Sequence, residues 1–68
     1  MSKKDYIKFA EMFNQQLADL NRNSFDDTNY QAIATVVVIA ELTADIFEQD
    51  NPRFNRSKFL VACGTKEN

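Results

Sequence analysis

The chain has 68 residues, which is enough for one domain with a small core, because a chain of this length buries only roughly 60% of the surface that its unfolded form exposes. It contains one cysteine and no histidine, which excludes an intrachain disulfide and disfavours a tetrahedral zinc site. The formal net charge of −2 disfavours a nucleic-acid-binding protein, which usually carries a basic stripe. We therefore expect no metal or cofactor, and we expect self-association or a partner to supply the stabilisation that a marginal core lacks.

The sequence favours an all-α fold. One glycine and one proline leave little material for the turns of a many-stranded sheet. The segment Val36–Ile39 is largely β-branched, but no second segment offers a strand to pair with it. We predict a single domain, residues 1–68, with two long antiparallel helices over about 3–21 and 28–49 and a short helix over about 56–63. Residues 65–68 are expected to form a frayed tail.

The first predicted helix carries apolar side chains at steps of three and four residues, as on one face of a helix. Ser2 is the expected N-cap, with Asp5 three residues later in the place of a capping-box partner. Ile7 and Met12 fall beside the apolar stripe. The face expected to point at the core consists of Tyr6, Phe9, Ala10, Phe13, Leu17 and Leu20.

The second predicted helix is apolar around much of its circumference. The line expected in the core has heptad-like spacing and consists of Tyr30, Ile33, Val37, Ala40, Ala44 and Phe47. A second line consists of Val36, Ile39, Leu42 and Ile46. Because two helices can cover only one side of a third, we predict that this second line forms an interface with another protein. The alternative is that Phe25, the third helix and the bend of the chain cover it completely.

The third predicted helix has sequence signals at both ends. The pair Asn51–Pro52 ends the helix before it, because the residue that precedes a proline is displaced from the helical conformation. Asn55 is the expected N-cap, and Phe54 and Phe59 have the spacing of a hydrophobic staple. Gly64 stands where a left-handed residue closes a helix.

Catalytic chemistry is not indicated by the residues of this chain. A nucleophile, a base or a metal in a cleft is the minimum for an enzyme, and histidine is absent. Cys63 lies in the last turn of the third predicted helix, where the negative end of the helix dipole raises the pKa of a thiol. We interpret it as a small buried hydrophobe and expect no enzymatic activity.

Three basic residues, Arg53, Arg56 and Lys58, lie close together around the start of the third predicted helix. As functional residues they would contact an acidic protein partner or a phosphate, with DNA the least favoured ligand of an acidic chain. As a solvated basic edge they would only keep the domain soluble. We assign them to the polar rim of the predicted interface, because charged residues commonly surround its apolar anchors.

The lengths of the apolar runs predict no membrane-spanning segment. The N-terminal residues Met1–Asp5 are polar and are followed by no apolar stretch of the kind found in signal peptides. The longest apolar run, Ala32–Ala40, has nine residues and is interrupted by Thr35, whereas ~20 are needed to cross a bilayer. The single cysteine fits a reducing compartment, so we expect a cytoplasmic protein.

Both ends of the chain resemble small, uncharacterised proteins of tailed bacteriophages. Residues 2–6 match the KKDY start of that family, and residues 50–64 match its C-terminal pattern DNPRF(D/N)RxKFLxACG. At Asn55 the family often has Asp, and both residues are good N-caps. The resemblance implies a phage origin and a place in the cytoplasm of a bacterial host, and it brings no activity with it.

The predicted function is that of a small phage accessory protein that binds and modulates a host or phage protein, with inhibition of a host enzyme or defence system as the expected form. The predicted interface would receive a helix of the partner or form a symmetric dimer, which is the commonest closed assembly. One alternative is a nucleic-acid-associated regulator that uses the three basic residues. Another alternative is a structural homo-oligomer.

Overall fold

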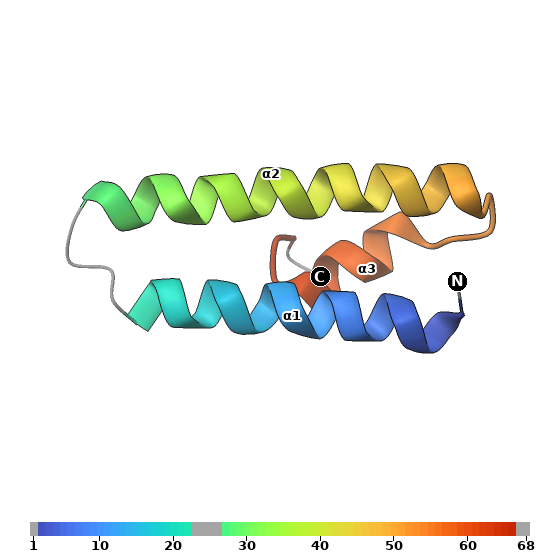
Figure 1. The fold of residues 1–68 in the computed structure, drawn as a ribbon, viewed down its shortest axis with the longest axis horizontal. Helices are drawn as coiled ribbons and strands as arrows, with labels where there is room; N and C mark the ends of the chain where they lie inside the picture. Colours follow the sequence, from blue (N-terminus) through green and yellow to red (C-terminus); the bar gives the residue numbers. More distant parts are fainter. Residues whose placement is uncertain (1, 23–26, 67–68) are drawn as a thin grey trace.

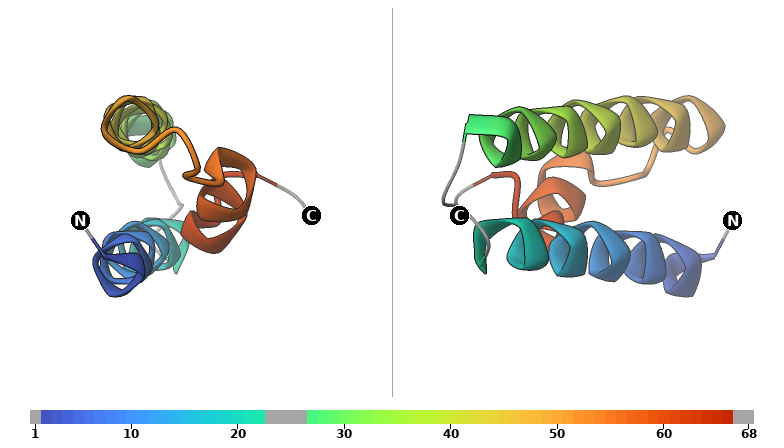
Figure 2. Two further views of the ribbon diagram at one scale, coloured as in Figure 1. Left: turned by 90° about the vertical axis from the view of Figure 1, so that its right-hand side faces the viewer. Right: turned by 60° about the vertical axis from the view of Figure 1, so that its left-hand side comes forward.

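The computed structural model describes residues 2–22 and 27–66 (Figure 1). Within these residues it consists of three helices, α1 (Lys3–Arg22), α2 (Asp27–Asp50) and α3 (Arg56–Cys63). Helices α1 and α2 lie side by side and antiparallel, and α3 packs on one face of the pair (Figures 1 and 2). The all-α prediction is confirmed, and the predicted bounds are displaced by no more than one residue at any helix end. Phe25 and residues 67–68 lie outside the described residues.

Helix α1 begins as its sequence predicts. The Asp5 carboxylate accepts a hydrogen bond from the Ser2 backbone N–H at 3.0 Å and another from the Ser2 hydroxyl at 3.2 Å. Asp5 thus takes the part that Glu or Gln plays in the usual capping box. The hydrogen bond from the Ser2 backbone N–H is the largest cause that lowers the pKa of the Asp5 carboxyl below its ordinary value, and the bond from the Ser2 hydroxyl lowers it further.

The N-terminus of α3 is fixed by a cap and a staple. The Asn55 side chain accepts a hydrogen bond from the Lys58 backbone N–H at 3.0 Å. The Phe54 and Phe59 rings, on either side of that cap, lie with centroids 5.4 Å apart. Both features agree with the prediction, and they supply the fixed start that a helix of only eight residues needs.

The C-terminus of α3 depends on Gly64. Its φ of 86° is in the left-handed region, and the N–H of Thr65 reaches the carbonyl of Leu60 at 3.1 Å, as in a Schellman motif. A Cβ at this position would lie 3.1 Å from Nδ2 of Asn14 on α1. The same Asn14 amide donates to the Ala62 carbonyl at 3.3 Å. Glycine therefore permits both the helix stop and the close approach of α1.

The core lies where the three helices meet. Its buried members are Ala10, Phe13 and Leu17 of α1, Ala40, Ala44 and Phe47 of α2, and Phe59, Leu60 and Cys63 of α3. The Phe47 ring is central, because the rings of Tyr6, Phe9, Phe54 and Phe59 all lie with centroids 4.9 to 5.5 Å from it. Such tilted and edge-to-face pairs add to the stabilisation from burial alone.

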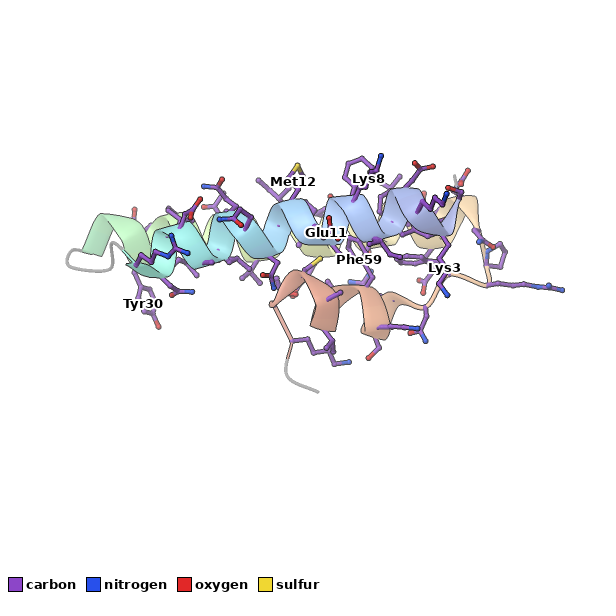
Figure 3. The ribbon with its side chains drawn as sticks, turned by 90° about the horizontal axis from the view of Figure 1, so that it is seen from below. Lys3, Lys8, Glu11, Met12, Tyr30 and Phe59 are labelled. Carbon is purple, nitrogen blue, oxygen red and sulfur yellow. The ribbon has the colours of Figure 1, made fainter. Side chains whose placement is uncertain are left out.

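Two residues predicted in the core are exposed. Tyr30 is 80% exposed because α3 covers only the other end of the pair, and the bundle has two helices where Tyr30 lies (Figures 1 and 3). Phe9 is 39% exposed and lies at the edge of the core, with its ring 5.3 Å from that of Phe47. Ile7 and Met12 are exposed, in agreement with their predicted place beside the stripe.

Candidate functional surfaces

The second apolar line of α2 lies largely at the surface. Ile39, Leu42 and Ile46 are 47%, 56% and 63% exposed. Their spacing of three and four residues places them on one face of the helix. The expectation that the other helices leave this line uncovered is met for these three residues.

Val36 does not belong to that exposed line, although the sequence grouped it there. It is partly buried and packs against the hydrophobic core. Val36 precedes the fully buried Ala40 by four residues, so the two side chains share a face of α2. The assignment of Val36 to a partner surface is corrected to the edge of the core.

The exposed line lies on the flank of α2 that is turned away from α3. Arg56 of α3 contacts α2 at Glu41 and Asp45, which marks the flank of α2 that faces α3. At 3.6 residues per turn, Ile39 and Ile46 lie on another flank. Figure 2 shows α3 on one side of the α1–α2 pair only, so no described element covers the opposite side.

Helix α1 contributes to the same side of the pair. Phe9 and Met12 are exposed, and Figure 3 shows Met12 and Lys8 pointing away from α3. We call the surface formed by Phe9, Met12, Ile39, Leu42 and Ile46 the open face. The molecule measures 39 × 20 × 17 Å, so its longer sides can receive a helix lying along them.

Helix α2 is also long and apolar enough, by length and composition, to cross a membrane. Within the 21-residue stretch Tyr30–Asp50, the most apolar window has a mean hydropathy of 1.5, and 17% of that window is buried. The length of the longest apolar run did not predict this stretch, because Glu41 and Asp45 interrupt the run. A mean hydropathy over many residues tolerates such isolated charges. Each carboxylate near the centre of a membrane helix costs ~2.5–3.5 kcal/mol. The exposed apolar side chains of the open face contribute to this hydropathy.

The basic residues do not form a rim around the open face. Arg56 donates through Nη1 to the Asp45 carboxylate and to the Glu41 carbonyl oxygen, the latter at 3.4 Å. Arg56 therefore ties α3 to α2 within the domain. Arg53 and Lys58 line a cavity on the side of α1 that faces α3. The predicted grouping of three basic residues with the apolar line is thus corrected.

The cavity lies between α1, the connection after α2, and α3, and has a volume of about 380 Å³. Three cationic side chains line it, Lys3, Arg53 and Lys58, and none of the carboxylates among residues 2–22 and 27–66 does. Its apolar wall includes the rings of Tyr6, Phe54 and Phe59. Lys3 and Tyr6 were not predicted as members of this site. Helical spacing alone does not show which side chains from separate segments of the chain lie close together.

Cys63 is a buried side chain and not a reactive surface thiol. It is 0% exposed, and burial raises its pKa from 9.0 to about 11. The raised pKa keeps the thiol neutral near pH 7, so the nucleophilic thiolate is scarce. The interpretation of Cys63 as a small hydrophobe is confirmed.

We predict that Cys63 makes the fold sensitive to high pH. Its neutral form is favoured in the folded state, so its contribution to stability is complete below pH 9 and is lost as the pH rises from about 9 to 11. Urea titrations should show the wild type losing up to about 3 kcal/mol more than Cys63→Ala across this interval. Equal pH dependence of the two proteins would contradict the burial effect.

Comparison with known proteins found no family model, curated protein or solved structure that matches the chain. What the chain binds is therefore inferred from its own surfaces, the open face and the cavity.

Proposed function

We propose that this chain is a small phage accessory protein that binds a host or phage protein through the open face and modulates it, as an inhibitor of an enzyme or a defence system. The observation that carries the proposal is the exposure of Ile39, Leu42 and Ile46 on one face of α2, on the side that α3 leaves uncovered. Exposed apolar patches of this kind mark interaction sites. The phage origin rests on the resemblance at the two ends of the chain, which brings no activity with it. The inhibitory role is part of the proposal and is supported by the open face alone.

The occupant that the open face fits best is an amphipathic helix of the partner. Ile39, Leu42 and Ile46 alternate steps of three and four residues, with Ile at the a positions and Leu at the d position of a coiled-coil seam. On its other side the α1–α2 pair is already closed by a helix, α3 (Figure 2). A partner helix on the open face would repeat that packing and cover the exposed side chains of α1 and α2 together.

The magnitude of the burial is sufficient for specific binding. Complete burial of one Leu or Ile side chain contributes about 1.5–3 kcal/mol, and these side chains are about half exposed before binding. Five such residues would contribute several kcal/mol, from which the cost of association is subtracted. A few central residues carry most of the energy of such interfaces, so single substitutions there have large effects.

The test is an Ile46→Asp substitution, which places a charge at the most exposed member of the apolar line. A partner would be captured from host lysate with the wild type, then purified, and its affinity measured by calorimetry. We expect Ile46→Asp to weaken binding at least ~30-fold, because an interface hot spot contributes 2 kcal/mol or more. The far-UV circular dichroism and the urea midpoint should remain those of the wild type.

The matched control is Tyr30→Asp, which introduces the same charge on the same helix at a side chain that is 80% exposed and outside the open face. It should bind as the wild type does. Equal affinity of all three proteins for the purified partner would refute the proposal. A dimer of the isolated chain that Ile46→Asp dissociates would replace it with the structural homo-oligomer, and flotation with lipid vesicles would replace it with membrane binding.

The alternative of a nucleic-acid-associated regulator receives less support. It required Arg53, Arg56 and Lys58 to act as one basic patch. Arg56 is engaged by Asp45, which neutralises its charge locally, and the other two line the cavity. Two remaining cations would give a weak phosphate contact with a shallow dependence on salt.

A further inference from the structure

We propose that the cavity between α1 and α3 is a binding site for a ligand that joins an aromatic group to a carboxylate. This site is separate from the open face and does not depend on the function proposed above. Two sources present such a ligand, a free aryl-alkyl carboxylic acid and a peptide segment in which an aromatic residue is flanked by acidic ones. The cavity recognises the chemistry that they share.

The apolar part of the ligand is indicated by the cavity wall. The volume of about 380 Å³ lies within the usual range for ligand sites, roughly 300–1,000 Å³. Tyr6, Phe54 and Phe59 supply three rings, whose centroids lie 4.7 Å apart for Tyr6 and Phe54 and 5.4 Å apart for Phe54 and Phe59. The rings already pack tilted against one another, so a further ring can join the cluster in the geometry that aromatic groups prefer.

The anionic part is indicated by the charges around the cavity. Lys3 comes from the start of α1, Arg53 from the connection after α2, and Lys58 from the first turn of α3. Three of the eight basic residues of an acidic chain thus line one cavity, and no Asp or Glu in the part of the chain that the structure describes lines it. A carboxylate there would receive charge-assisted hydrogen bonds without facing a negative neighbour on the cavity wall.

A third observation is independent of volume and charge. The hydroxyl of Tyr6 is buried and, within the part of the chain that the structure describes, has no hydrogen-bond partner. Buried polar groups are rarely left in this state, because an unsatisfied group is costly. Tyr6 lines the cavity, but its hydroxyl oxygen is itself enclosed, so a ligand oxygen would accept its proton only after neighbouring side chains move.

The experiment uses the full chain labelled with ¹⁵N and two matched probes, 3-phenylpropionate and the neutral 3-phenylpropanol. We expect the carboxylate to cause saturable shifts at the amides of Tyr6, Phe54, Lys58 and Phe59. The alcohol should bind at least tenfold more weakly. A second pair of probes, the peptides Glu-Glu-Phe-Glu-Glu and Gln-Gln-Phe-Gln-Gln, distinguishes the two sources. Saturation by either acidic probe supports the site, and the tighter of the two names the source.

Variants assign the binding to particular groups. Lys58→Gln should weaken 3-phenylpropionate at least threefold, whereas Lys8→Gln, which removes a cation on the side of α1 away from α3, should not change the affinity (Figure 3). Tyr6→Phe keeps the ring and removes the enclosed hydroxyl. Weaker binding by this variant, with the spectrum of a folded protein, would show that the ligand reaches the hydroxyl, and an unchanged affinity would assign the binding to the rings and the cations. The proposal is overturned if the alcohol binds as well as the acid, if the shifts map to Ile39 and Ile46, or if no probe saturates.

Discussion

Replacing Phe47 with alanine is expected to lower the free energy of unfolding by about 3–5 kcal/mol. The Phe47 side chain is 4% exposed, and its ring contacts four other aromatic rings contributed by α1, α3 and the connection between α2 and α3. A chain of 68 residues has a net stability of roughly 3–10 kcal/mol. The variant should therefore be largely unfolded, or close to it, in a urea titration followed by far-UV circular dichroism.

Leu42→Ala is the control for that substitution. Leu42 lies on the same helix and is 56% exposed, so its truncation should change the free energy of unfolding by no more than about 0.5 kcal/mol. Finding the two variants equally stable would show that the ring cluster does not hold the helices together. Finding Leu42→Ala strongly destabilised would show instead that the open face is covered in solution, as it would be in a dimer.

Replacing Ala40 with leucine is expected to cost about 1–3 kcal/mol of stability, because three added carbon atoms must fit where α2 packs most closely. Ala40 and Ala44 are both 0% exposed, and their small side chains let the backbone of α2 approach the rest of the core. The excess volume should separate the helices and weaken the near-UV circular dichroism of the aromatic side chains, which depends on their fixed packing. Thermal unfolding followed in the near and far ultraviolet measures both effects.

The matched control is Ala34→Leu, the same substitution on the same helix at an exposed position. It should leave the melting temperature within a few degrees of the wild type, since surface changes are usually worth less than about 0.5 kcal/mol. If Ala40→Leu were as stable as Ala34→Leu, the close packing at Ala40 would not be a determinant of the fold.

The sequence predicted the helices well because their signals are local. Periods of three and four residues define the faces of α1 and α2, and the ends of α3 are marked by Asn55 and Gly64, whose side-chain hydrogen bond and left-handed φ the structure confirms. Each of these signals spans only a few residues. The exposed state of Ile39, Leu42 and Ile46 also followed from the sequence, because two helices cannot surround a third.

The errors concern residues whose environment depends on where α3 lies. Tyr30 continues the periodic pattern of α2 into a part of the bundle that α3 does not reach, so the pattern alone predicts burial. Val36 lies between the two apolar lines, and only the angle at which α1 packs decides which line it joins. The basic residues were grouped by their closeness in sequence, whereas Arg56 donates to Asp45, and Lys58 lines the cavity together with Lys3.

The one-sided position of α3 has a consequence for how the molecule opens. At one end of the bundle α3 lies beside α1 and α2, and at the other end only α1 and α2 lie against each other (Figure 1). The aromatic cluster around Phe47 draws its rings from α1, α2, α3 and the connection before α3. Amide protons around Tyr30 should exchange with solvent through local fraying, whereas those around Phe47 should exchange only when the whole domain unfolds. The bundle is therefore anchored at one end and loosens from the other, so substitutions near Tyr30 alter a local opening equilibrium before they alter the global one.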